Sequence, residues 1–201
     1  MSLTAELHGL FTGFLPGPRV ADRLPDGWAE APYTRFTVSP LSPTIGAEID
    51  GVSLVDEVDD ELFAELNRAL LEWKVLFFRN QDITGEQQVA FARRWGPLEA
   101  HPFIKLNVEQ PDDPEVVRFE KGPQLGGYEN VWHSDVTWRE VPSLGSVLRA
   151  VEVPPVGGDT LFADMGAAYD RLPASVKERI DGLTAMHDWV VTFGMGMDEA
   201  T

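Results

Sequence analysis

The stretch "DDELFAELNRALLEWKVLFFR", residues 59–79, carries the clearest local pattern in the chain. Its first residues are acidic, and negative charge at the N-terminus of a helix interacts favourably with the helix dipole. Its apolar side chains then recur at helical spacing, at Leu62, Leu66, Ala69, Leu70 and Trp73. The apolar run "KVLFFR" follows at once and is typical of a strand buried on both faces. The stretch therefore predicts a helix followed by an inner strand.

Short elements flank this pair on both sides. Before it, residues 35–38 and 45–49 are rich in residues that favour strands, and prolines separate the two runs. Further upstream, residues 1–33 hold several prolines and glycines without periodicity, which predicts an irregular arm lying on the domain or a flexible lead-in.

A second helix is predicted directly after the apolar strand. Thr84 and Gln87, three positions apart, form the pattern of a capping box at its start. The pair Gly96-Pro97 is expected to end this helix after Trp95.

Beyond Pro97 the sequence changes to short extended runs between Pro and Gly clusters, which is typical of an antiparallel sandwich or barrel. The runs are "EVVRF" (115–119), "VWHSDVTW" (131–138), "SVLRAVEV" (146–153), "TLFAD" (160–164) and "TAMHDWVVTF" (184–193). Before the last run, Pro173 is expected to open a short helix that ends at Gly182. Helices early and strands later predict an α+β domain.

Composition narrows the class of protein. The 201 residues are 43% hydrophobic and 24% charged, which fits one globular domain. A net charge of −17 disfavours nucleic acid and anionic membranes as partners. The chain has no window apolar enough to span a membrane and starts without a basic leader, so we expect a cytoplasmic protein. Without cysteine, a metal would need His, Asp, Glu or water as ligands.

A candidate metal pair lies in the run "VWHSDVTW". Because side chains alternate along a strand, His133 and Asp135 would share one face, about 6–7 Å apart. An imidazole and a carboxylate so placed can take two adjacent positions on a divalent metal, and one more histidine would complete the 2-His-1-carboxylate triad of Fe(II) oxygenases. The alternative is a core histidine satisfied by a neighbouring aspartate.

Several motifs, taken in order along the chain, resemble those of the taurine/2,4-dichlorophenoxyacetate dioxygenase family of Fe(II)- and 2-oxoglutarate-dependent oxygenases. The similar stretches are "SPTIGAEIDGVSL" (42–54), "WKVLFFRNQDIT" (73–84), "FARRWGPLEAHPF" (91–103), "WHSDVTW" (132–138) and "GGDTLFADMGAAYDRL" (157–172). The resemblance implies a double-stranded β-helix, or jelly-roll, core with flanking helices over residues 34–201. It also implies that this fold is C-terminally incomplete, because the family's second iron-binding histidine and its 2-oxoglutarate-binding arginine lie further downstream.

The resemblance assigns roles to five residues. It implies that His133 and Asp135 are the catalytic iron ligands and that Thr160 binds the 2-oxoglutarate cosubstrate. It places His101 and Val136 against the substrate. Taken without the family, Thr160 is an ordinary strand threonine and His101 a loop histidine before a proline.

His187 invites a separate hypothesis. It lies 52 positions after Asp135, a spacing found between the aspartate and the distal histidine of other 2-oxoglutarate oxygenase families. Those families place an arginine some ten residues later, and no arginine follows here. We therefore expect His187 to lie in the core or beside the ligands, and leave the ligand role as an alternative.

The function implied is a 2-oxoglutarate-dependent non-haem iron dioxygenase. It would use Fe(II), 2-oxoglutarate and O₂ to hydroxylate a small anionic substrate, giving succinate and CO₂. Alkyl sulfonates or sulfates, as in taurine catabolism, and aryloxy or other carboxylic acids are the candidate classes, although Ile104 and Glu129 disfavour taurine itself. The alternatives are a non-catalytic or truncated jelly-roll protein and a metal-independent binding module, and a homo-oligomer stays open.

Overall fold

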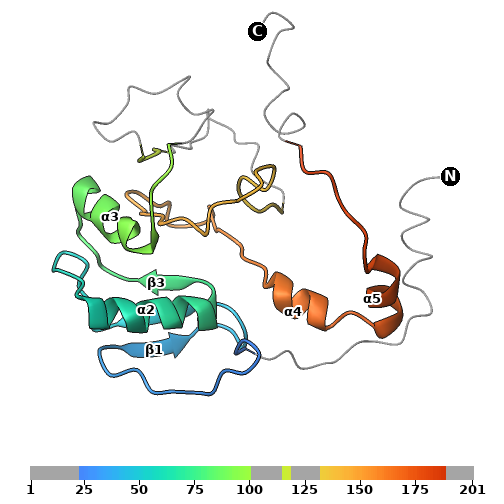
Figure 1. Cartoon of the computed structure of the whole chain (residues 1–201). Coiled ribbons are helices and arrows are strands. Elements are labelled where there is room, and N and C mark those ends of the chain that lie inside the picture. Colours follow the sequence, from blue (N-terminus) through green and yellow to red (C-terminus); the bar gives the residue numbers. More distant parts are fainter. Residues whose placement is uncertain (1–22, 101–114, 119–131, 189–201) are drawn as a thin grey trace, which may run out of the picture. The chain divides into compact units, whose positions relative to one another are not determined.

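The computed structural model describes residues 23–100, 115–118 and 132–188 (Figure 1). The chain divides into two compact units. The first is made of residues 1–82 and 153–183, and the second of residues 83–152 and 184–201. Each unit is described by itself below.

The first unit contains a three-stranded sheet in the order β1-β2-β3. Strand β1 (Thr37–Pro40) runs antiparallel to β2 (Ala47–Asp50), and Val38 faces Ile49 in the register. Strand β3 (Leu76–Phe78) runs parallel to β2. The three predicted strands are therefore confirmed. The residues of β3 are only partly buried, so the expectation that both of its faces are covered is wrong.

Helix α2 (Asp60–Trp73) connects the two parallel strands and lies along the sheet (Figure 1). Its start is capped by Asp59, whose carboxylate accepts the backbone N–H of Leu62 at 2.7 Å. At its end Lys74 adopts a left-handed conformation with φ 67°, and its N–H donates to the carbonyl of Leu70. Leu66 and Ala69 have no exposed surface, which confirms the apolar stripe predicted for this helix.

The described part of the N-terminal arm, residues 23–33, is irregular and packs on α2. The Arg68 guanidinium donates to the carbonyls of Ala31 and Pro32, each at 2.8 Å. Arg68 also lies over the ring of Tyr33, 3.9 Å from its centroid. These contacts come from side chains of the helix, so this part of the arm lies on the folded layer.

The later part of the first unit holds two short helices. Helix α5 (Ala174–Ile180) begins after Pro173, and Gly182 follows with φ +72°, as predicted. Helix α4 (Met165–Asp170) lies in a stretch for which no helix was predicted. The signal was Asp164, whose carboxylate accepts the N–H of Ala167 at 3.0 Å and caps the helix.

The second unit begins with α3 (Gly85–Ala92), which continues as the 3₁₀ turn η1 (Arg93–Trp95). Both halves of the predicted capping box of Thr84 and Gln87 are formed. Gly96 ends the turn with φ 142°, which confirms the predicted stop after Trp95. The Phe91 and Trp95 rings meet edge to face with centroids 5.0 Å apart.

The strands predicted after Pro97 are not seen in the described residues. Residues 132–138, 146–153 and 160–164 contain turns, bends or irregular backbone, and the described ends of the other two runs, 115–118 and 184–188, are not strands either. A strand exists only through hydrogen bonds to a neighbour, and these residues have no ladder partner among those described. The local sequence pattern therefore predicted extended backbone here, but it could not show whether a neighbouring strand is present to pair with it. None of the helices in the described part of the chain has the length and apolar character needed to cross a bilayer.

Candidate active site

The His133–Asp135 pair lies on a turn and not on a strand. The Nε2 atom of His133 is 3.3 Å from Oδ1 of Asp135, and the two side chains are 53% and 69% exposed. The expectation that they share the buried face of a strand is therefore wrong. The two polar atoms are closer together than the spacing expected along a strand, because the backbone turns at Asp135.

Val136, the predicted substrate-contacting residue, is at the centre of this turn. It is only 8% exposed and has φ 46°, a left-handed conformation that is unusual for a β-branched residue. Its carbonyl accepts the N–H of Arg139 at 3.0 Å, which closes the turn. Such a conformation costs on the order of 1–3 kcal/mol and persists only where the surroundings hold it.

Within the described part of the second unit, side chains from two distant segments contact this turn. Nδ1 of His187 is 2.8 Å from Oγ1 of Thr137, across 50 residues. The Arg139 guanidinium binds the Glu99 carboxylate, which also accepts a hydrogen bond from the Ser143 hydroxyl at 3.4 Å. We name residues 133–139 the HxD turn. These contacts connect it to two other segments.

The donor atoms of the HxD turn fit two neighbouring positions of a metal ion. Ligands about 2.1 Å from a metal and at right angles to one another are roughly 3 Å apart, close to the 3.3 Å between Nε2 and Oδ1. Among the described residues, no group of three or more His, Asp or Glu side chains is placed to hold one ion. The described residues thus place two candidate ligands side by side and no third one next to them.

Thr160, the predicted cosubstrate-binding residue, belongs to the first unit and is exposed. The turn before it contains Gly157 with φ 81° and Gly158 with φ 74°, a conformation that glycine adopts without strain. A side chain on Gly158 would also come within 3.3 Å of Pro154. The glycine pair is therefore required by the backbone that leads into Thr160.

Two contacts anchor the segment that follows Thr160 to the sheet layer. Phe162 meets the Phe77 ring of β3 edge to face, with centroids 6.4 Å apart. Asp164 forms an ion pair of 3.1 Å with Lys74, and its side chain is 6% exposed. Burial opposes ionisation of Asp164, but the N–H of Ala167 and the Lys74 ammonium outweigh this effect and lower its pKa. Asp164 is therefore held as a carboxylate.

His101, the second predicted substrate-contacting residue, is outside the described residues. His133 and Asp135 belong to the second unit and Thr160 to the first. The structure thus brings together the two predicted metal ligands, and it brings His187 to their turn. His187 is exposed, so the expectation that it lies in the core is wrong. Sequence reasoning missed Glu99 and Arg139 as residues that hold the turn. No local pattern identifies them, because they are 40 positions apart.

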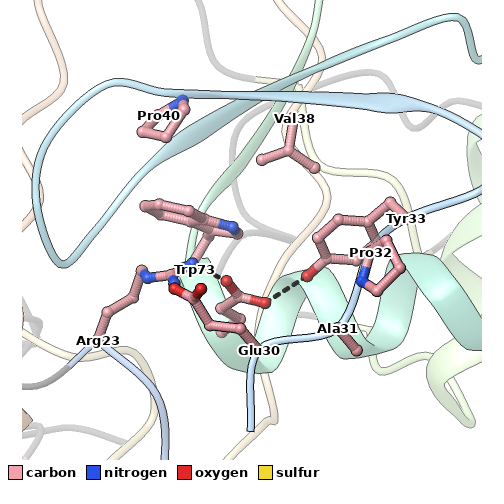
Figure 2. Close-up of a pocket in the computed structure, with 9 residues that line it drawn as sticks. Arg23, Glu30, Ala31, Pro32, Tyr33, Val38, Pro40 and Trp73 are labelled. Atoms are coloured by element: carbon pink, nitrogen blue, oxygen red, sulfur yellow. Dashed lines mark hydrogen bonds and ion pairs between the residues drawn. The ribbon is translucent and has the colours of Figure 1, made fainter.

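A cavity of about 410 Å³ lies elsewhere, in the first unit, between the arm, β1 and the end of α2 (Figure 2). Glu72 lines this cavity, and its buried carboxylate binds the Arg23 guanidinium and accepts a hydrogen bond from the Tyr33 hydroxyl at 2.5 Å. Arg23 also lies over the indole of Trp73, 4.5 Å from its centroid. Because the charged groups of this cavity pair with one another, we interpret it as the anchor of the arm and not as a catalytic site.

The chain matches the family described as "Taurine catabolism dioxygenase TauD, TfdA family" over residues 37–199. It is 42% identical to the (S)-phenoxypropionate/alpha-ketoglutarate-dioxygenase of Sphingobium herbicidovorans over 160 residues, which cover 76% of this chain and 53% of that protein. It is 37% identical to the alpha-ketoglutarate-dependent 2,4-dichlorophenoxyacetate dioxygenase of Cupriavidus pinatubonensis, covering 74% of this chain and 57% of that protein.

Solved structures agree with this. The fold matches a taurine dioxygenase from Burkholderia xenovorans with a TM-score of 0.64 and 38% identity, over 74% of this chain and 52% of that one. It matches AAD-2, solved in complex with Mn(II) and N-oxalylglycine, with a TM-score of 0.54 and 30% identity, over 73% of this chain and 49% of that one.

The match over residues 37–199 defines the class: the chain belongs to the TauD/TfdA dioxygenase family. Its particular relatives include enzymes named for aryloxy acids and, in Acinetobacter baylyi, a protein named alkylsulfatase that is 36% identical. The chain spans about half the length of these relatives.

Proposed function

We propose that the chain is part of a non-haem iron dioxygenase that uses 2-oxoglutarate, with residues 34–201 belonging to its jelly-roll catalytic domain. The observation that carries the proposal is the 3.3 Å approach of His133 Nε2 and Asp135 Oδ1, which suits two adjacent positions on one metal ion. Membership of the family supports it. The proposal places the enzyme in the cytoplasm, with small molecules as its partners.

Each predicted residue has a defined task. His133 and Asp135 hold Fe(II), the imidazole as a neutral donor and the carboxylate as a charged one. The Thr160 hydroxyl donates a hydrogen bond to the distal carboxylate of 2-oxoglutarate. Bound iron supplies the oxygen chemistry, in which decarboxylation of 2-oxoglutarate to succinate and CO₂ accompanies hydroxylation of the substrate. The protein contributes orientation and excludes water.

The substrate class is a small organic anion with an apolar body. Relatives of this chain are named for phenoxypropionate, 2,4-dichlorophenoxyacetate and sulfate esters, and all of these combine an acidic group with an aryl or alkyl part. On a chain with net charge −17, such an anion needs specific donors. We assign His101 to the acidic group and the buried side chain of Val136 to the apolar part.

The competing function is a non-catalytic protein of the same family that binds a ligand or partner without metal. The two functions differ in their need for iron. If the second holds, exposed His133 and Asp135 would be surface residues, and no property of the chain would depend on Fe(II).

The test is an anaerobic titration of the chain with Fe(II) and 2-oxoglutarate. We expect the weak visible charge-transfer band of 2-oxoglutarate chelated to iron, and we expect its loss in His133→Ala and Asp135→Ala. Asp56→Ala, which also removes an exposed carboxylate, is the matched control and should retain the band. A folded chain with no band would mean that these residues by themselves do not form the iron site, and a band that persists in His133→Ala and Asp135→Ala would overturn their assignment as ligands.

A further inference from the structure

We propose that His187 is a positioning residue for the HxD turn: through its bond to Thr137 it fixes the direction in which Asp135 presents its carboxylate. The inference rests on the proposed function, since it assumes that Asp135 binds a metal. It adds a role for a residue that the family resemblance does not place among the iron ligands.

The contact itself is well defined. Nδ1 of His187 and Oγ1 of Thr137 are 2.8 Å apart, a normal hydrogen-bond distance. The two residues are 50 positions apart, and both belong to the second unit. Thr137 is two residues after Asp135, so the bond attaches another segment of the chain immediately beside the proposed ligand.

The HxD turn needs such an attachment. In the described residues it is not part of a strand, so no ladder of backbone bonds holds it. The side chains of His133 and Asp135 are more than half exposed, so burial contributes little to holding them. Val136 keeps a left-handed φ of 46°, which requires outside support. Within the turn, the Val136–Arg139 bond is local and cannot fix its direction relative to other segments.

Two long-range contacts could supply that support, and they are not equivalent. The Arg139–Glu99 ion pair joins side chains that are 31% and 46% exposed, so solvent and salt weaken it. The His187–Thr137 bond is also exposed, but Thr137 is only two residues from Asp135, whereas Arg139 is four residues away. We therefore assign the fixing of the carboxylate to His187.

A direct ligand role for His187 is the main alternative. In the described residues, His187 does not form a group with two other His, Asp or Glu side chains around one point. Its Nδ1 is already engaged by the Thr137 hydroxyl. A ligand role would therefore use Nε2 and would not need Thr137, which gives the two roles different mutational signatures.

The test measures binding of Mn(II) by its electron paramagnetic resonance signal, with N-oxalylglycine present, the pair that AAD-2 holds in its solved structure. Thr137→Val removes the hydroxyl at nearly constant shape, and Thr137→Ser retains it. His187→Phe removes both ring nitrogens, and His187→Asn retains a polar atom near the position of Nδ1. We expect Thr137→Val and His187→Phe each to weaken Mn(II) binding about 10-fold, and the double variant no further. Thr137→Ser and His187→Asn should stay within about 3-fold of the original chain.

Each other outcome decides between the roles. If His187→Phe and His187→Asn both lose binding while Thr137→Val does not, His187 is a ligand and the positioning role is overturned. Unchanged affinity in Thr137→Val and His187→Phe overturns the positioning role alone. If the unsubstituted chain binds no Mn(II), the proposed function fails and the positioning role fails with it. The unfolding temperature of each variant is measured in parallel, because a purely structural bond would lower it without the rescue pattern in affinity.

Discussion

The sheet layer around α2 and the HxD turn are held together in different ways. In the layer, Leu66, Ala69 and Ala47 have no exposed surface, the helix is capped at both ends, and β2 pairs with a strand on each side. In the HxD turn, the two proposed ligands are more than half exposed, and single side-chain bonds from His187 and Glu99 hold the backbone. Apolar burial therefore stabilises the sheet layer, whereas the candidate site depends on a few directional contacts.

We expect the largest change in the free energy of unfolding from a substitution in the core of the sheet layer. Replacing Leu66 by Ala should lower the free energy of unfolding by about 2–5 kcal/mol, because it empties a fully buried position between helix and sheet. Leu71 on the same helix is 44% exposed and is the matched control. Leu71→Ala should cost less than about 1 kcal/mol. Urea unfolding followed by helical circular dichroism measures both, and equal losses would show that the burial described here does not govern stability.

A smaller effect concerns the ion pair that ties α4 to the end of α2. Because the folded pKa of Asp164 is lowered, its stabilising contribution is present above its unfolded pKa of about 4 and is lost as the pH falls through the folded value. Asp164→Asn should therefore cost about 1–3 kcal/mol at pH 7, since it removes one partner of a nearly buried pair.

The difference between Asp164→Asn and the original chain should begin to shrink as the pH falls below about 4, and it should vanish only below the lowered folded pKa of Asp164, where both chains carry a neutral side chain at this position. Unfolding free energies measured from pH 7 to pH 3 check this. A difference that stays constant over the whole range would mean that the charge of Asp164 does not contribute. Asp170→Asn, a change at an exposed position on the same helix, is the control.

We expect the smallest change in stability from substitutions of Val136 in the HxD turn. At most positions glycine is less stable than alanine by roughly 0.5–1 kcal/mol. At Val136, with φ 46°, glycine is free of the strain that alanine retains, so Val136→Gly should be at least as stable as Val136→Ala. Thermal unfolding of the two variants measures the order. A clearly less stable glycine variant would contradict the left-handed conformation of this residue.

The sequence predicted those elements whose defining features, such as caps and apolar periodicity, all lie within one short segment. The apolar stripe of α2, the capping box of Thr84 and Gln87, and the stop at Gly96 are all formed. The three early strands were also predicted, because their neighbours in the sheet lie close in sequence: a short loop joins β1 to β2, and α2 joins β2 to β3. Helix α4 was missed although Asp164 caps it, since a helix of 6 residues has little periodicity to recognise.

For the candidate site, residue types and their order predicted which residues would carry the chemistry, and these roles stay predictions. The pair His133 and Asp135, the glycines before Thr160, and membership of the dioxygenase family follow from residue types and their order. How these residues are presented became clear from the three-dimensional structure: the HxD segment is a turn with exposed side chains, and it contacts His187 and Glu99. The physical reason is that residue type limits which bonds a side chain can make. The partners that form these bonds are 40 to 50 residues apart, and they meet only when the chain folds.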